Sequence, residues 1–165
     1  MTMQAARAQL ELAVEGAWAA VGELVLIALE DQPSAGSLAA ADDLAEQVSE
    51  IQGALAGARD ALTAPSLLPS PLSEVLPVVT AGLTEAERRY WQRVRAHGPI
   101  THLRVATRRL GGPWPEWRRS VERTALGCEE PLSQATTAAQ LCGQEICDLV
   151  RFSRTTSSGG CRGPR

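Results

Sequence analysis

Residues 10–29 read LELAVEGAWAAVGELVLIAL, and the spacing of their apolar side chains indicates a long helix. These side chains recur at alternating steps of four and three residues, which places them on one face of an α-helix. Further apolar residues widen that face, so more than one neighbour must cover a helix that we expect from about Met3 to Glu30. The seam consists of Leu10, Val14, Ala17, Val21, Leu24 and Ala28.

A second seam with the same period follows a cluster of helix-breaking residues at 31–36. It lies in residues 41–62, ADDLAEQVSEIQGALAGARDAL, and Ser37 is the predicted N-cap of its helix. Two matched seams joined by a short turn predict an antiparallel helical hairpin over residues 1–63. The hairpin is either half of a bundle core or a surface for self-association or for a partner helix. The second seam consists of Ala41, Leu44, Val48, Ile51, Leu55, Ala58 and Leu62.

Prolines mark the middle of the chain. Residues 63–73 contain three of them and cannot form a regular helix. A further proline, Pro77, limits residues 74–82 to a turn or a single helical turn. We therefore expect a Pro-rich linker over residues 64–83.

The second half predicts shorter helices. Thr84, with Glu87 three residues later, has the pattern of a capping box and predicts a helix over residues 85–96. Three more are expected: one capped by Thr101 and stopped by Gly111-Gly112, one over 115–126 with a proline in its first turn, and one over 133–152.

The expected fold is therefore all-α. It combines the long N-terminal antiparallel helical hairpin with a basic bundle of three to four shorter helices at 84–152. The tail at 153–165 is rich in Ser, Thr, Gly and Arg, and we expect it to be disordered.

Charge is distributed unevenly along the chain, which contains no lysine. Residues 1–83 have two arginines and eleven acidic residues, whereas residues 84–165 have fourteen arginines and eight acidic residues. Such a basic segment predicts contact with the phosphates of a nucleic acid. The alternative is that the guanidinium groups solvate outer helix faces or pair with the acidic hairpin. The candidate phosphate-binding residues are Arg88, Arg95, Arg104, Arg108, Arg118, Arg119 and Arg123.

Part of this segment has a recognisable pattern. Residues 83–101 read LTEAERRYWQRVRAHGPIT, and Leu110-Gly111 and a further helix follow. Over residues 83–126 the chain resembles the helix-turn-helix core of winged-helix DNA-binding domains. The resemblance implies that 115–126 is the recognition helix, with Arg118, Arg119 and Arg123 facing DNA. The Gly-Gly-Pro-Trp-Pro connector is bulkier than the family pattern, and no β-hairpin wing is expected after it.

The tryptophans of the second half predict two kinds of environment. Trp117 lies on an apolar stripe with Val121, and we expect both Trp117 and Trp91 to be buried. Trp114 stands between two prolines and is a candidate exposed anchor for a partner. An aromatic side chain held in this way loses little entropy on binding.

Signals for catalysis or cofactor binding are weak, and we expect neither an enzyme nor a metal or cofactor site. His97 and His102 are the only imidazoles, and no carboxylate close in sequence would orient either of them. The four cysteines, at positions 128, 142, 147 and 161, lack metal-ligand spacing. They are expected to be small buried residues or surface thiols.

The sequence also predicts a cytoplasmic protein that does not enter a membrane. Its longest apolar stretch, Ala17 to Leu29, has 13 residues, whereas a membrane span needs about 20. The expected function is that of a non-catalytic helical binding protein in a nucleic-acid-associated complex. The alternative is an adaptor subunit that binds other proteins, or copies of itself through the N-terminal hairpin, without nucleic acid.

Overall fold

The computed structural model describes residues 2–33, 38–64, 71–96 and 99–157. This part of the chain is helical throughout apart from short turns and contains no strand, so the all-α fold is confirmed. The elements are α1 (Met3–Leu29), α2 (Ala39–Thr63), α3 (Leu72–Arg89), the π-helix η1 (Tyr90–Ala96), α4 (Pro99–Thr107), α5 (Trp114–Gly127) and α6 (Glu129–Ser157).

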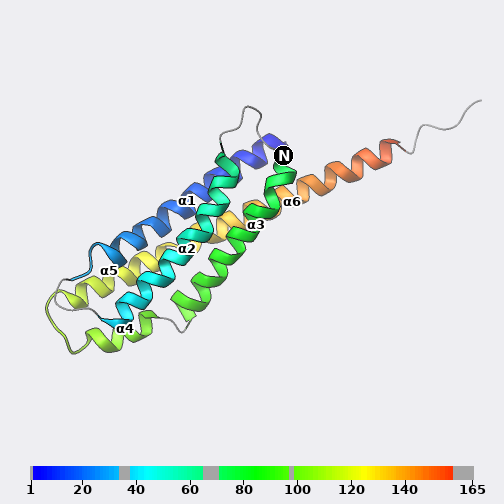
Figure 1. Ribbon diagram of the computed structural model, residues 1–165. Coiled ribbons are helices and arrows are strands. Elements are labelled where there is room, and N and C mark those ends of the chain that lie inside the picture. Colours follow the sequence, from blue (N-terminus) through cyan, green and yellow to red (C-terminus); the bar gives the residue numbers. More distant parts are fainter. Residues whose placement is uncertain (1, 34–37, 65–70, 97–98, 158–165) are drawn as a thin grey trace, which may run out of the picture.

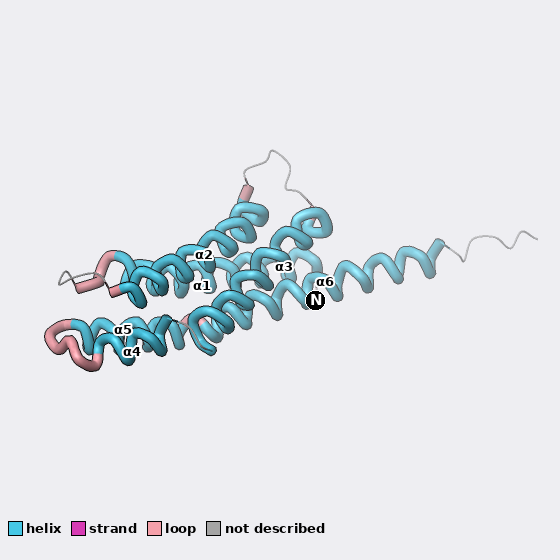
Figure 2. The backbone as a smooth tube through the Cα atoms, turned by 60° about the horizontal axis from the view of Figure 1, so that its bottom comes forward, coloured by secondary structure: helices cyan, strands magenta, loops and turns pink. Residues whose placement is uncertain are grey.

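Four long rods form an antiparallel bundle (Figure 1). Helix α1 packs between α2 and α6, and α3 closes the ring on the opposite side, again between α2 and α6. Helices α4 and α5 lie at one end, where α4 contacts α2 and α5 contacts α1. Figure 2 shows α4 and α5 as a layer beneath α1 and α2 at that end. The two halves of the sequence therefore share one core.

Both predicted seams of the N-terminal hairpin are buried. All six seam residues of α1 and all seven of α2 pack against each other and against α3, α5 and α6. The interpretation of the hairpin as half of a bundle core is confirmed. Ser37, the predicted N-cap of α2, lies outside the described residues, and α2 begins after Leu38.

Helix α3 corrects the prediction that residues 72–83 belong to a linker. Its buried residues follow the same four-three spacing as the other seams, and their burial outweighs the cost of Pro77. Pro77 leaves the Ser73 carbonyl without an amide partner, but it lies on the exposed side of the helix, where water can replace that partner. Thr84 is consequently mid-helical, and the capping-box prediction is wrong. The buried residues are Leu72, Leu76, Val79, Leu83 and Ala86.

A glycine allows α3 to approach α2 closely. A Cβ atom at Gly82 would lie 2.8 Å from the Ala54 carbonyl oxygen and 3.1 Å from the Ala58 Cβ. Because the carbonyl oxygen of Ala54 is part of the backbone of α2 and cannot rotate away, a side chain at position 82 would push the two helices apart. Gly82 therefore fixes the spacing within this pair.

The π-helix η1 continues α3. It buries the side chain of Tyr90 and leaves that of Trp91 exposed. Tyr90 and Val94 carry the seam into the core, and the Tyr90 hydroxyl donates a hydrogen bond to the Ala125 carbonyl at 2.7 Å. Trp91 lies beside this seam and is 41% exposed, so the prediction that it is buried is wrong. It contacts the Tyr90 ring edge-to-face, with the ring centroids 5.5 Å apart.

Helices α5 and α6 form one nearly continuous rod. Cys128, between them, has helical dihedral angles (φ −82°, ψ −18°), and its carbonyl accepts a hydrogen bond from the Leu132 amide. Pro131 falls in the first turn of α6, where no amide donor is needed, so α6 begins at Glu129 and not at the predicted residue 133. A single buried seam runs through the junction: Trp114, Trp117, Val121, Ala125, Cys128, Leu132, Ala135, Ala139 and Cys142.

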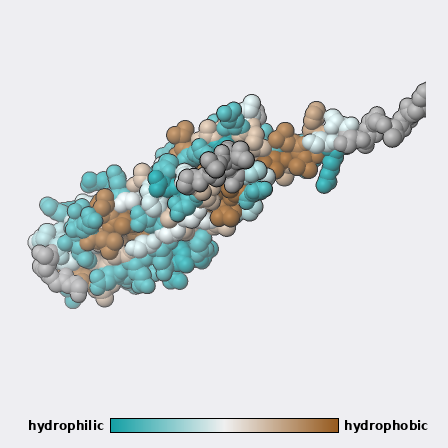
Figure 3. Space-filling view, turned by 45° about the horizontal axis from the view of Figure 1, so that its top comes forward, coloured by the Kyte–Doolittle hydropathy of each residue, from teal (hydrophilic) through white to brown (hydrophobic). Residues whose placement is uncertain are grey.

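The C-terminal part of α6 extends beyond the other helices (Figure 1). Residues 147–156 are all exposed, and apolar side chains gather on this overhang (Figure 3). The largest is Phe152, which is 70% exposed. Residues 153–157, expected to be disordered, are helical, and the rest of the predicted tail lies outside the described residues.

Candidate nucleic-acid interface

Three of the seven candidate arginines are neutralised within the chain. Arg88 pairs with Glu85 at 2.7 Å and Arg104 pairs with Glu122 at 2.7 Å, while Arg95 lies 3.8 Å from Glu129. All three carboxylates belong to the basic half. These three arginines therefore do not pair with the acidic hairpin, which was the alternative that we weighed, but with glutamates of their own half of the chain.

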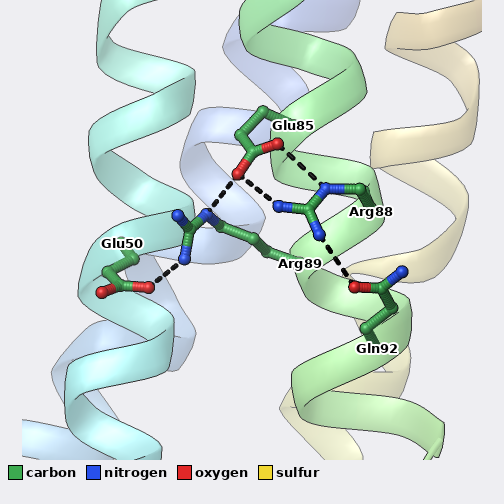
Figure 4. A network of polar contacts seen from close by, with 5 residues as sticks. All are labelled: Glu50, Glu85, Arg88, Arg89 and Gln92. Carbon is green, nitrogen blue, oxygen red and sulfur yellow. Dashed lines mark hydrogen bonds and ion pairs between the residues drawn. The ribbon is translucent and has the colours of Figure 1, made fainter.

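Glu85 lies at the centre of the largest of these networks (Figure 4). It accepts hydrogen bonds from Arg88 and Arg89, and Arg89 also pairs with Glu50 of α2. The hydrogen bond from Arg88, followed by that from Arg89, lowers the pKa of Glu85 to about 2. Arg88 donates further to Gln92, so its guanidinium group is engaged on several sides. On this face of α3 the guanidinium groups are thus engaged by side chains of the chain itself.

The other four candidate arginines form no ion pair among the described residues. Arg108, Arg119 and Arg123 are exposed and take part in no ion pair within the described part of the chain. Arg118 is half-buried, and its Nε atom is buried without a hydrogen-bond partner. The structure therefore divides the candidates into three paired, three open and one partly enclosed.

Two arginines that the sequence analysis did not select belong with the open ones. Arg93 in η1 and Arg109 after α4 are exposed, and no ion pair involves them among the described residues. Neither has an acidic residue three or four positions away, whereas Arg88 has Glu85 at that spacing. This spacing alone does not identify the open arginines, because Arg104 has no acidic residue at that spacing and still pairs with Glu122 of α5.

Four of the five open arginines lie on α5 or directly after α4, at the end of the bundle that these two helices close. Arg119 and Arg123 are four residues apart and share the exposed face of α5. Arg108 and Arg109 directly follow α4, and the Arg104–Glu122 pair connects α4 to α5. This α4–α5 end is defined here by Arg108, Arg109, Arg119 and Arg123, and it presents guanidinium groups that can each donate two hydrogen bonds to one phosphate.

Trp114 is not the exposed anchor that we expected. It is 3% exposed and packs edge-to-face on Trp117, with the ring centroids 5.6 Å apart. Gly111 and Gly112 adopt left-handed backbone angles (φ 59° and 62°), and the chain then enters α5 with Trp114 as its first seam residue. Trp117 is buried as predicted, and its Nε1 donates a hydrogen bond to the Ile27 carbonyl at 2.8 Å.

The exposed tryptophan is Trp91, which lines a groove of about 630 Å³ beside α6. Leu126 and Leu141 supply further apolar surface, and Glu87, Glu129 and Glu130 supply carboxylates. The groove combines residues from α1, α3, η1, α5 and α6 that only the bundle brings together, so no single stretch of sequence predicts it.

The cysteines and the histidine of the described residues are divided between the core and the surface. Cys128 and Cys142 are buried, and their thiols donate to the carbonyls of Ala20 and Ala6. Burial raises the pKa of Cys128 to about 12, so its thiol stays protonated. Cys147 and His102 are exposed, whereas His97 and Cys161 lie outside the described residues. No group of three or more His, Cys, Asp and Glu side chains in the described ranges could hold a metal ion.

Helix α1 is, by length and composition alone, able to cross a membrane. A core helix of a soluble protein or a signal sequence has the same properties, and seven residues of α1 are buried in the bundle.

Comparison of the chain with protein-family models, with curated proteins and with solved structures finds no match in any of the three. A functional proposal therefore depends on the geometry of the chain itself.

Proposed function

We propose that this is a non-catalytic helical protein of a nucleic-acid-associated complex in the cytoplasm, and that its α4–α5 end contacts phosphates. The single observation that supports the proposal most is the exposure of Arg108, Arg109, Arg119 and Arg123 without ion pairs in the described part of the chain. Exposed, unpaired guanidinium groups keep their hydrogen-bond donors and charge for a polyanion.

Binding of this kind depends on backbone charge and not on base sequence. The seam of α5 is occupied by the core, and the charged side chains on the exposed face of this helix, which the helix-turn-helix resemblance assigns to recognition, are Glu116, Arg119 and Arg123. Two arginines on one face suit phosphate contacts better than a base-reading set of side chains. The helix-turn-helix assignment itself stays a prediction.

A salt titration with a labelled oligonucleotide tests the proposal. We expect affinity to fall steeply from low to moderate salt, because bound phosphates release counterions. The double variant R108E/R109E should bind more weakly and reduce the slope of log K against log salt by about one for each arginine removed. The matched control R151E/R154E makes the same charge change on α6, far from the α4–α5 end, and should keep the wild-type slope. Equal behaviour of the two variants would contradict the proposal.

The second candidate is a protein–protein adaptor that makes no contact with nucleic acid. The Trp91 groove favours it, because an exposed aromatic side chain flanked by Leu126 and Leu141 is typical of a protein-binding surface. Under this alternative the oligonucleotide does not bind at any salt concentration, and the chain co-purifies with another protein. Variants of Trp91, and not of Arg108 and Arg109, would then disrupt the complex.

A further inference from the structure

The face of the α5–α6 rod opposite the core is exposed along its length. The exposed residues recur at steps of three and four, as the buried seam does, and they cross the junction at Cys128 without interruption. One stripe therefore extends from the basic part of α5 to the acidic start of α6. It consists of Arg119, Arg123, Leu126, Glu130, Gln134, Thr137 and Leu141.

Two opposite charges on this stripe are seven residues apart. Arg123 and Glu130 are separated by two helical turns and so occupy the same lateral position on the rod. Both are exposed, and neither forms an ion pair within the described ranges, although Glu130 accepts a hydrogen bond from Gln134 at 3.0 Å. Their charges are therefore available to a partner with the reverse order of charge.

A second copy of the chain, turned antiparallel, has that reverse order. When two identical rods pack about a two-fold axis near the midpoint of residues 123 and 130, Arg123 of each copy lies opposite Glu130 of the other. The arrangement works because residues at the same lateral position face each other across an antiparallel helix pair. One interface then contains two reciprocal ion pairs, as an isologous contact requires.

The residues at the midpoint also suit this arrangement. Leu126 is 50% exposed, and the two-fold axis brings it against Leu126 of the second copy. Gly127 lies beside it with open space within 4 Å of where a Cβ would stand, so the Leu126 side chain of the second copy meets no opposing side chain at that position. The centre of the interface would be apolar, with charged residues on both sides of it.

The Trp91 groove receives the rest of the second α5. It is continuous with the stripe, because Leu126, Glu130, Gln134, Thr137 and Leu141 line it as well. Arg119 precedes Arg123 by one helical turn. Arg119 of the second copy therefore enters the groove of the first copy farther from the two-fold axis. There the Trp91 face offers a cation–π contact, and Glu87 offers the carboxylate oxygen that does not accept a hydrogen bond from Thr136.

We propose that the outer face of the α5–α6 rod is a homodimer interface, in which Arg119 and Arg123 of each copy dock in the acidic, Trp91-lined groove of the other. The occupant of the groove is thus a second copy of this chain. The inference does not depend on the proposed function, because it concerns the protein free of nucleic acid.

Charge exchange tests the interface. Sedimentation equilibrium of nucleic-acid-free protein at low salt should show a monomer–dimer equilibrium. R123E and E130R should each raise the dissociation constant by at least about tenfold, because each places two like-charged pairs in the interface. The double variant R123E/E130R restores opposite charges and should return the constant to within about threefold of the wild-type value. R109E, which makes the same charge change outside the stripe, should dimerise like the wild type.

Two results would overturn the proposal. The first is a wild-type protein that stays monomeric over the whole concentration series. The second is a double variant that dimerises no better than R123E alone, although circular dichroism shows that both are folded. The R108E/R109E variant used for nucleic acid lies outside the stripe, so failure of the dimer and failure of the proposed function are distinguishable.

Discussion

Tyr90 connects two parts of the core that lie 35 positions apart in the sequence. Its ring is buried, and its hydroxyl donates to the Ala125 carbonyl at 2.7 Å, which fixes η1 against the C-terminal end of α5. Burial raises the pKa of Tyr90 above its ordinary value. The folded protein therefore favours the neutral phenol.

This leads to a pH-dependent prediction for Y90F. At pH 7 the variant should be less stable by about 1 kcal/mol, the usual net value of one hydrogen bond. A raised pKa in the folded state means that the contribution of Tyr90 is complete below its unfolded pKa of about 10 and decreases as the pH rises above it. Urea denaturation of the wild type and of Y90F, at pH 7 and at pH 11, measures the difference in unfolding free energy at each pH. A stability difference that stays constant between these pH values would contradict the prediction.

Single residues were also where the sequence analysis was least accurate. Trp91 and Trp114 have exchanged the environments that we expected for them. Pro113 and Pro115 suggested a rigid surface anchor, but the same prolines start α5 and make Trp114 the first residue of its seam. Local sequence describes the backbone of such a residue well. It does not describe which neighbouring helix will cover the side chain.

At the scale of helices, the network around Glu85 joins α3 to α2 through Arg89 and Glu50. The lowered pKa of Glu85 gives a second pH prediction, for E85Q. A folded pKa of about 2, below the ordinary value of 4.5, means that the ion pairs stabilise the protein above pH 4.5 and are lost as the pH falls towards 2. E85Q should therefore melt below the wild type at pH 7, and the difference should vanish near pH 2.

Thermal melts over this pH range check the prediction. E74Q is a suitable control, because Glu74 is exposed in the first turn of α3 and forms no ion pair among the described residues. Its melting temperature should follow the wild type at each pH apart from a small constant offset. If E85Q and E74Q behave alike, the network around Glu85 does not contribute to stability.

Helices were predictable from sequence where the apolar period was long and uninterrupted. All thirteen side chains predicted for the seams of α1 and α2 are buried, because so many regularly spaced apolar residues outweigh the effect of any single helix-breaking residue. Helix α3 was missed because Pro77 was given more weight than the buried seam from Leu72 to Ala86. The groove and the outer stripe could not be predicted, since both depend on the junction at Cys128 being helical.

For the whole molecule, the most informative property is that the boundary between acidic and basic sequence does not coincide with a boundary between folded units. The acidic and basic halves share one core, yet four of the five open arginines lie at the α4–α5 end. Arg119 and Arg123 belong both to that end and to the proposed dimer interface. One surface would thus serve two binding partners in turn.

Nucleic acid and dimerisation should therefore compete. Adding a single-stranded oligonucleotide to the dimer should produce complexes that contain one chain, because the phosphates and the second copy require the same guanidinium groups. Light scattering coupled to size-exclusion chromatography measures the number of chains per complex. A complex that contains an intact dimer would show that the two surfaces are separate.

The overhang of α6 has a consequence of a different kind. Its eleven residues from Cys147 to Ser157 rise by roughly 16 Å as a helix. The side chains of residues 147–156 are all exposed and add nothing to the bundle core, so shortening this stretch should leave the packing of the bundle unchanged. The helix therefore sets Phe152 and the neighbouring exposed apolar side chains apart from the bundle, at a distance fixed by the number of helical residues before them.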